Sequence, residues 1–519
     1  MRKSKLSLAS FLLCLFFFSF ANQANAQQKL KGYVLDENTL KPIEGANVKS
    51  SINNVITDRF GKFLVTIAPT DRSVDISYVG YALQKVSFSN VQDSLLIYLK
   101  STSNTMDEIV VVGFGTTKKS DITGAVSKIT AKDFNKGANT SADQLIAGKV
   151  SGVQVIQNSG EPGGGISVNV RGMGSINAGN SPLYVIDGFP IDNGSTVSGT
   201  GANFTGMRTS RNPLNSINPN DIESIEILKD ASATAIYGSR GANGVVLITT
   251  KAGKAGALKV DYDVYFGVQN VMRDIHLLNA QQYQTVINEL IQAGAGTPSQ
   301  TVGNFNGGTN WLDNMYHKNA SLQNHNLSFS GGDEFNKFYA SLNYSDQNGI
   351  LINSANKRYT ARLNLEHNKG NFKTGFNLTT SFVKDNYVAN GMDLNERAGI
   401  IYAAIAYDPT LPIYTSTGAY TLSPDMNIDN PLAIANGKTS ISNLYRTLGT
   451  AYGELTFLKD FKAKLNIGAD ISNQRRDTYV DRQTIEGRAN GGIASILTGT
   501  DNSFLSEFTV SYKKKWSIH

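Results

Sequence analysis

The sequence has almost no cysteine, and it has little proline and little charge. Its 519 residues include 1 cysteine and 12 prolines, and charged residues make up 17% of the chain. The one cysteine, Cys14, lies close to the N-terminus. The rest of the chain therefore has no disulfide framework, no thiol nucleophile and no cysteine ligand for a metal.

Long apolar runs are missing from the chain after its N-terminal segment. No stretch there reaches the roughly 18 residues of a membrane-spanning helix. Hydrophobic residues nevertheless make up 40% of the chain, and 49 residues are glycine. This composition is that of a folded protein and excludes a disordered, collagen-like or coiled-coil chain.

Positive charge is only slightly in excess. Lys and Arg number 48 and Asp and Glu number 42, and three of the basic residues, Arg2, Lys3 and Lys5, belong to the N-terminal segment. The remainder carries a net charge of +3, so its charge does not indicate a nucleic-acid-binding protein.

Residues 1–26 have the pattern of a secretory signal peptide. The three basic residues precede the apolar run from Leu12 to Phe20, and Ala24-Asn25-Ala26 forms a small-residue cleavage site. Cys14 is followed by Leu15 and is not preceded by a small-residue lipidation site, so we do not expect a lipoprotein. The pattern predicts a secreted, periplasmic or outer-membrane protein.

Residues 29–100 predict a small β-sandwich. Short β-favouring runs occupy residues 31–36, 46–50, 62–67, 74–79 and 94–99, and Asp58–Gly61 predicts a hairpin turn. The runs Lys31–Val34 and Ser77–Tyr81 resemble the carboxypeptidase regulatory-like domain. This segment contains no histidine, so the resemblance does not imply peptidase activity, and we expect a spacer or docking module.

A linker at residues 101–119 contains an acidic start, a β-branched run and a glycine stop. Its members are Asp107, Glu108, Ile109, Val110, Val111, Val112, Gly113, Phe114 and Gly115. The pattern alone fits either a buried strand or an exposed segment that adds a strand to the sheet edge of a partner.

Residues 120–254 predict a mixed α/β domain. Strands are expected at residues 167–171, 183–187, 224–228 and 244–250. Thr140 and Asp143 are a candidate capping pair for a short helix, and Asp230 is the expected N-cap of a helix that ends at Gly238.

A family resemblance rests on this domain. The stretch Asn218–Lys251, together with Gly148–Val153, Arg171-Gly172 and Pro182–Gly188, resembles the plug domain of TonB-dependent outer-membrane transporters, and of the SusC/RagA type among them. The signature positions are Arg171, Gly172, Asp187, Gly188, Asp221, Glu223, Glu226, Lys229, Asp230, Tyr237, Gly238, Arg240, Gly241 and Gly244.

The resemblance implies a partner and a function. Residues 107–115 stand where this family carries its TonB box, which favours strand addition to the periplasmic part of TonB over a buried strand. By the same resemblance, we expect import of oligosaccharides or peptides across the outer membrane of a Gram-negative cell with a SusD-like surface lipoprotein. The other expected neighbour is outer-membrane lipid.

Residues 255–519 alternate apolar and polar side chains with a period of two. In one run Leu258, Val260, Tyr262, Val264, Phe266 and Val268 occupy the even positions, and similar runs begin near residues 338, 359, 372, 461 and 504. Strands of about 10 residues with aromatic ends are typical of a membrane barrel. Short connections at residues 368–371 and 459–460 and long ones at 272–320 and 385–443 fit this prediction, and Asn279 with Gln282 predicts a helix cap in the first long connection.

About eight strands fit into this region, which is few for a barrel that must enclose a plug. The chain also ends at His519 without a terminal aromatic residue, so we expect the barrel to be incomplete and the sequence to be a fragment. The predicted fold class is β-dominated and multidomain, with a small β-sandwich, an α/β plug domain and an incomplete antiparallel transmembrane β-barrel.

Catalytic, cofactor and metal motifs are not expected. Gly160–Gly165 lacks the lysine of a phosphate-binding loop, and Asp425, Asn427 and Asp429 lack the glycine and glutamate that complete a calcium loop. Asp221, Glu223 and Glu226 are expected to share one solvated strand face. Three function classes stay open: an energised importer, a surface-binding protein without transport, and a secreted hydrolase.

Overall fold

The computed structural model describes residues 28–514, except 38–39, 79–80, 82, 89–93, 101–108, 113–114, 119–125, 173, 175–178, 192–211, 274, 296–307, 389–398, 424–427 and 459. The expected signal peptide lies outside these residues. In the described part of the chain, no helix has the length and apolar character needed to cross a membrane. The chain divides into two compact units near residue 110, and each is described by itself.

The first unit is a β-sandwich. Its sheets have the strand orders β4-β1-β7 and β3-β2-β5-β6. The strands are β1 (Gln28–Asp36), β2 (Asn47–Lys49), β3 (Asn54–Ile56), β4 (Lys62–Ile67), β5 (Ser73–Ser77), β6 (Gln84–Ser87) and β7 (Leu95–Leu99). The expected strands and the sandwich are therefore present, and β3 and β6 are additional.

The core of this sandwich consists of the apolar side chains that alternate with exposed ones along its strands. Leu30 and Val34 of β1 pack with Phe63, Val65 and Ile67 of β4, and all five are buried. The predicted turn at Asp58 forms because its carboxylate accepts hydrogen bonds from the amides of residues 60 and 62, both at 2.9 Å. Gly61 takes a φ of +72°, which glycine adopts without strain.

The plug region has a five-stranded sheet with the order β10-β15-β16-β13-β14 and a hairpin of β11 and β12. The strands are β10 (Val126–Thr130), β11 (Val153–Gln157), β12 (Ile166–Val170), β13 (Leu183–Ile186), β14 (Phe189–Ile191), β15 (Ile222–Leu228) and β16 (Val245–Thr250). The short helices are η2 (Ala142–Ile146), η3 (Pro213–Ser216), η4 (Pro219–Asp221), α2 (Ala231–Thr234) and η5 (Ala235–Gly241). A buried apolar cluster with members from β13, β15 and β16 is the core of this region.

One capping prediction in the plug was wrong in detail and one was confirmed. The N-cap of η2 is Ser141, whose partner is Gln144, so the pair lies one residue beyond the expected Thr140 and Asp143. Asp230 is the N-cap of α2, as expected, although its side chain makes no capping hydrogen bond to this helix. Its carboxylate pairs with the guanidinium of Arg171.

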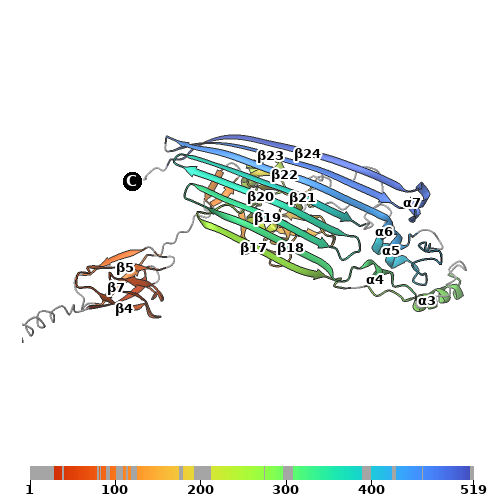
Figure 1. Ribbon diagram of the computed structural model, residues 1–519, viewed down its shortest axis with the longest axis horizontal. Coiled ribbons are helices and arrows are strands. Elements are labelled where there is room, and N and C mark those ends of the chain that lie inside the picture. Colours follow the sequence, from red (N-terminus) through yellow and green to blue (C-terminus); the bar gives the residue numbers. More distant parts are fainter. Residues whose placement is uncertain are drawn as a thin grey trace, which may run out of the picture. The chain divides into compact units, whose positions relative to one another are not determined.

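Eight antiparallel strands follow in sequential order and form one long sheet, which we call the wall (Figure 1). They are β17 (Gly256–Gln269), β18 (Ala320–Gly332), β19 (Asn336–Asn348), β20 (Ala355–Lys369), β21 (Phe372–Tyr387), β22 (Lys438–Phe457), β23 (Phe461–Val480) and β24 (Ile493–Tyr512). The sheet is open, because the described residues of β17 and β24 do not pair with each other. The expected incomplete antiparallel barrel is confirmed.

The connections differ between the two ends of the wall. Those between β18 and β19, β20 and β21, and β22 and β23 are short, whereas the long ones carry helices that gather at the other end, which we call the loop end (Figure 1). These helices are α3 (Ala280–Gln292), α4 (Trp311–Met315), α5 (Ile400–Ala406), α6 (Pro431–Gly437) and α7 (Ile485–Asn490). Asn279 and Gln282 form the predicted capping box of α3, with hydrogen bonds of 2.9 and 3.1 Å.

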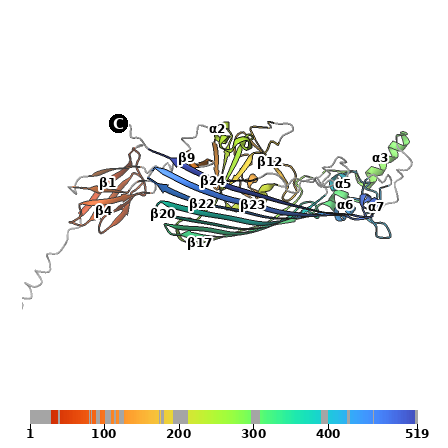
Figure 2. The ribbon, with the colours of Figure 1, turned by 90° about the horizontal axis from the view of Figure 1, so that it is seen from above.

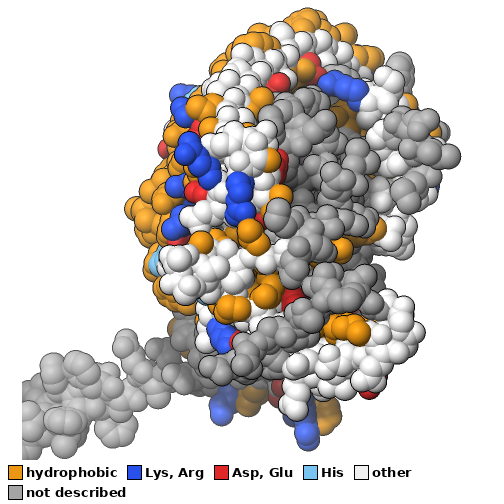
Figure 3. Space-filling model, turned by 90° about the vertical axis from the view of Figure 1, so that its right-hand side faces the viewer, with side chains coloured by type: hydrophobic (Ala, Val, Ile, Leu, Met, Phe, Trp, Pro, Cys, Tyr) orange, Lys and Arg blue, Asp and Glu red, His pale blue; other side chains and the backbone are white. Residues whose placement is uncertain are grey.

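The two faces of the wall differ in polarity, as the alternation predicted. Tyr359 and Leu365 of β20 are 48% and 43% exposed on one face, whereas Arg358, Thr360 and Arg362 are buried on the other. The plug lies against the polar face (Figure 2). Viewed from the loop end, hydrophobic side chains gather along the outer rim of the wall (Figure 3).

Candidate functional site

The linker segment with the TonB-box-like pattern forms a two-stranded sheet. β8 (Ile109–Val112) pairs with β9 (Gly115–Lys118), and no third described strand joins them. Asp107, Glu108, Gly113 and Phe114 lie outside the described residues. The segment has the extended backbone that both alternatives require, so its role in binding a partner stays a prediction.

Two of the plug signature residues, Asp187 and Gly188, form the turn between β13 and β14. Their φ angles are +48° and +86°, the left-handed conformation that a two-residue hairpin of type I′ requires at both positions. The Asp187 carboxylate accepts hydrogen bonds from the amide of Thr250 at 2.9 Å and from its hydroxyl at 2.5 Å. The turn is thereby fastened to the end of β16.

An arginine of the wall meets the plug at this point. Arg362 of β20 has a buried side chain that donates to the carbonyl oxygen of Lys251 at 2.6 Å and to the hydroxyl of Thr250. Its guanidinium also lies 3.6 Å from the Asp187 carboxylate. A single side chain therefore joins the wall to the hairpin turn and to the end of the plug sheet.

Asp221 makes a second contact between plug and wall, and its burial shows that the predicted solvated acidic face was wrong. It is buried at the end of η4, and its carboxylate accepts a hydrogen bond of 2.8 Å from the Tyr339 hydroxyl of β19. Glu226 is also buried and forms an ion pair of 3.0 Å with Lys128. Asp221 and Glu226 are buried and the Glu223 side chain is about half exposed, so the three acidic residues do not share one solvated face.

Two further arginines of the wall extend this contact. Arg358 donates to the carbonyl oxygens of Thr140 and Asn215 at 2.9 and 3.2 Å. Arg446 of β22 donates to the hydroxyl of Ser216 at 3.4 Å, and a bidentate pair with Asp470 of β23 holds its guanidinium in place. Both arginines therefore reach the plug near η3.

An asparagine pair completes the contact. Asn218, which caps η4, donates to the side-chain oxygen of Asn326 of β18 at 2.8 Å. We call the polar contacts between plug and wall the polar seam. On the wall side, those described above are made by Asn326, Tyr339, Arg358, Arg362 and Arg446.

Most of the other signature residues have their contacts inside the plug. Lys229 donates to the carbonyl oxygen of Ser151 at 3.1 Å, and Arg171 pairs with Asp230. Gly172, Gly238 and Gly244 have φ angles of +91°, +60° and +90°. Gly241 packs tightly on Thr234, and Tyr237 packs on the apolar cluster that contains Leu228. Arg240 borders a cavity that Phe504 also lines. The Glu223 carboxylate lies 3.8 Å from the Lys254 ammonium group.

Asp143, which was expected to cap a helix, has its carboxylate buried in the interior of the plug. Asp143 accepts hydrogen bonds from the Tyr184 hydroxyl at 3.0 Å and from the Asn212 side chain. Burial raises the pKa of Asp143 to about 6, and the hydrogen bonds from Asn212, Tyr184 and Ser141 oppose this shift. Burial and the adjacent Asp143 also raise the pKa of Tyr184 above its usual range.

One apolar contact also joins plug and wall. Phe189 of β14 is 1% exposed, and its ring lies over Gly468 of β23. A Cβ atom at position 468 would lie 2.6 Å from the ring. Glycine is needed here because nothing larger leaves room for the ring.

The described residues contain no group of three or more His, Cys, Asp or Glu side chains that could hold a metal. Asp425 and Asn427 of the calcium-like pattern lie outside the described residues. Asp429 accepts a hydrogen bond of 2.7 Å from the amide of Ile485. The residues of the polar seam form hydrogen bonds and ion pairs between the plug and the wall.

Comparison with known domain families gives two matches. Residues 118–245 match the TonB-dependent Receptor Plug Domain, and residues 30–111 match the CarboxypepD_reg-like domain. Both agree with the resemblances drawn from the sequence.

Known relatives match most of the chain. It is 34% identical to TonB-dependent receptor SusC of Bacteroides thetaiotaomicron over 492 residues, which are 88% of this chain and 46% of SusC. It is also 34% identical to TonB-dependent receptor P26 of Formosa agariphila over 502 residues, which are 94% of this chain and 47% of that receptor. The chain thus spans about half the length of these curated relatives.

A solved structure supports the same assignment. The RagAB peptide importer in its open-open state superposes with a TM-score of 0.61 and 25% identity, over 72% of this chain and 43% of that one. These relatives are receptors and importers, and none is named as an enzyme. Over the residues that it spans, the chain is a homologue of SusC/RagA-type TonB-dependent receptors.

Proposed function

We propose that this chain is part of an outer-membrane importer that TonB energises, and that it takes up oligosaccharides or peptides with a SusD-like surface lipoprotein. Residues 1–26 act as the signal peptide, 29–100 as the regulatory-like domain, 101–119 as the linker with the TonB-box-like segment, 120–254 as the plug and 255–519 as the wall. The relatives' names support TonB-dependent import as a class.

The polar seam is the observation that carries the proposal. The plug has an apolar core of its own, against which Leu448 and Leu505 of the wall pack, and Phe189 of this core lies over Gly468 of the wall. Most of the plug–wall contact described above consists of hydrogen bonds and ion pairs instead. Polar interfaces of this kind can separate and reform in water, whereas a shared apolar core would have to be exposed.

The mechanism that follows is mechanical. Substrate captured at the loop end changes the plug, and the segment at residues 107–115 is then taken up as an added strand by TonB. Force on this segment opens the seam, which is a switch between an ordered and a displaced plug. No bond of the substrate is made or broken.

The test introduces a proline into the TonB-box-like segment by mutating the chromosomal gene. Val111→Pro removes a backbone donor and blocks strand addition, whereas Ser103→Pro changes the same linker outside the segment. The proposal expects Val111→Pro to abolish accumulation of labelled oligosaccharides or peptides while surface binding persists. Ser103→Pro should leave both unchanged.

A surface-binding protein without transport is the alternative. It requires that Val111→Pro alter neither accumulation nor growth on these nutrients. Normal accumulation in that variant would overturn the importer.

A further inference from the structure

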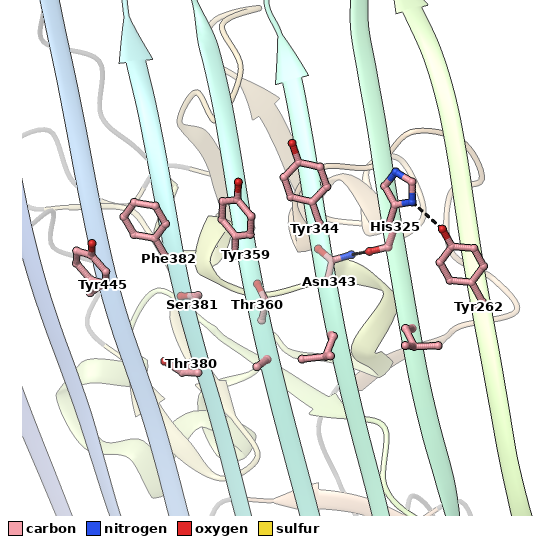
Figure 4. Close-up of a pocket in the computed structure, with 13 residues that line it drawn as sticks. Tyr262, His325, Asn343, Tyr344, Tyr359, Thr360, Thr380, Ser381, Phe382 and Tyr445 are labelled. Atoms are coloured by element: carbon pink, nitrogen blue, oxygen red, sulfur yellow. Dashed lines mark hydrogen bonds between the residues drawn. The ribbon is translucent and has the colours of Figure 1, made fainter.

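An aromatic row crosses the outer face of the wall near its loop end. His325, Tyr344, Tyr359, Phe382 and Tyr445 are paired directly across five neighbouring strands. The ring centroids of Tyr344 and Tyr359 lie 5.0 Å apart, and those of Phe382 and Tyr445 lie 4.6 Å apart. Tyr262, one level further from the loop end, reaches His325 with a hydrogen bond of 2.7 Å (Figure 4).

A hollow opens beside this row, away from the loop end. The next level across the strands is Leu327, Leu342, Ala361 and Thr380, and these side chains with the rings line a hollow of about 510 Å³. The hollow exists because Ala361 and Thr380 are small between larger neighbours. Leu342 is 56% exposed beside it, so the lining is apolar and open to the surroundings of the wall.

Two lysines face each other on the opposite side of the aromatic row. Lys357 of β20 and Lys384 of β21 are directly paired one level nearer the loop end. Like charges in this position repel each other. Asp346 lies 3.0 Å from Lys357 and offsets one of the two charges, while the neighbour of Lys384 on its other side is Asn443.

We propose that this face binds a lipid with an anionic phosphate headgroup from the leaflet at the loop end. The phosphate lies at Lys357 and Lys384, the aromatic row borders the boundary between headgroup and chain, and an acyl chain fills the hollow. The uncompensated positive charge selects the headgroup, and the apolar hollow selects the chain. Aromatic rings prefer this depth in a membrane. The proposal rests on the placement of the wall in a membrane.

The experiment places a reporter at the rim of the hollow. Tyr445→Trp introduces a tryptophan into the full chain, which is reconstituted in vesicles with brominated phosphatidylglycerol or brominated phosphatidylcholine. The chain without this substitution gives the background from Trp311 and Trp516. Quenching at a several-fold lower fraction of phosphatidylglycerol than of phosphatidylcholine is expected.

Substitutions in this background separate headgroup from chain. Lys384→Gln should reduce the preference for phosphatidylglycerol about five-fold, because one lysine at a membrane surface contributes about 1 kcal/mol. The matched control Lys318→Gln, in an exposed connection, should not change it. Ala361→Leu fills the hollow and should weaken quenching by both lipids, whereas Ala340→Leu, on the same face outside the hollow, should not.

Two results would overturn the proposal, and they differ in meaning. Equal quenching by the two lipids would show that the face has no preference for an anionic headgroup, although the wall lies in the membrane. A reporter that neither lipid quenches contradicts the membrane placement itself.

Discussion

The guanidinium of Arg362 on the wall donates a hydrogen bond of 2.6 Å to the carbonyl oxygen of Lys251, where the last strand of the plug sheet ends. The same side chain reaches Thr250 and lies 3.6 Å from Asp187 in the plug hairpin. One buried arginine of the wall therefore contacts three residues of the plug.

Arg362→Met should weaken the hold of the wall on the plug. The substitution leaves the Asp187 carboxylate without its wall cation, and loss of one partner of a buried pair costs about 3 kcal/mol. We expect the plug of the purified chain in detergent to become sensitive to trypsin at a lower urea concentration. Arg475→Met is the control, because Arg475 pairs with Asp477 at an exposed site where an ion pair contributes little. Equal protection of the two variants would show that the seam does not depend on Arg362.

The stability of the plug should fall as the pH rises through about 6. The pKa of Asp143 is about 6 in the folded chain against an ordinary value of 3.8, so the folded plug binds a proton more tightly than the unfolded one. Stability is therefore greatest below about pH 4 as far as this group is concerned, and about 3 kcal/mol is lost by pH 7. Tyr184, Asn212 and Ser141, which contact it, are uncharged in this range.

Asp143→Asn tests this dependence. The variant keeps the shape of the side chain and cannot ionise, so its urea midpoint should change less between about pH 5 and pH 7.5 than that of the unmodified chain. The same slope in both proteins would assign the pH dependence to other groups.

Gly468→Ala should disturb the contact with Phe189. The added Cβ atom would lie 2.6 Å from the ring, which must move out of a site where it is buried. We expect a loss of about 1–3 kcal/mol, typical of overpacking, in the same urea assay. Gly449→Ala on the neighbouring strand is the control, since its Cβ atom would meet Leu378 at an ordinary 3.6 Å. Phe189→Leu combined with Gly468→Ala should recover part of the loss.

The wall was predictable from the sequence because a period of two is a local property. Leu258, Val260 and Tyr262 are exposed on one face, as their alternation indicated. The expected helix at Asn279 was confirmed for the same reason, since a capping box involves residues only three apart.

The polar seam was not predictable, because it joins residues that are distant in the sequence. Arg362 and Lys251 are 111 residues apart, and Asp221 and Tyr339 are 118 apart. The solvated face expected for Asp221, Glu223 and Glu226 was wrong because Tyr339 of the wall binds the buried Asp221 and Lys128 of β10 pairs with the buried Glu226. The position of Asp143 next to Asn212 is likewise set by tertiary packing, and no local pattern marks it.

The most direct test of the account is a reversible link across the seam. Asn218 and Asn326 form a hydrogen bond of 2.8 Å between plug and wall, so Asn218→Cys with Asn326→Cys places two thiols within reach of a short, reducible bis-methanethiosulfonate cross-linker. The account predicts that cells with the cross-linked double variant bind labelled substrate but do not accumulate it, and that a reductant restores accumulation. Unimpaired accumulation with the cross-link fully formed would contradict a plug that must separate from the wall at this seam.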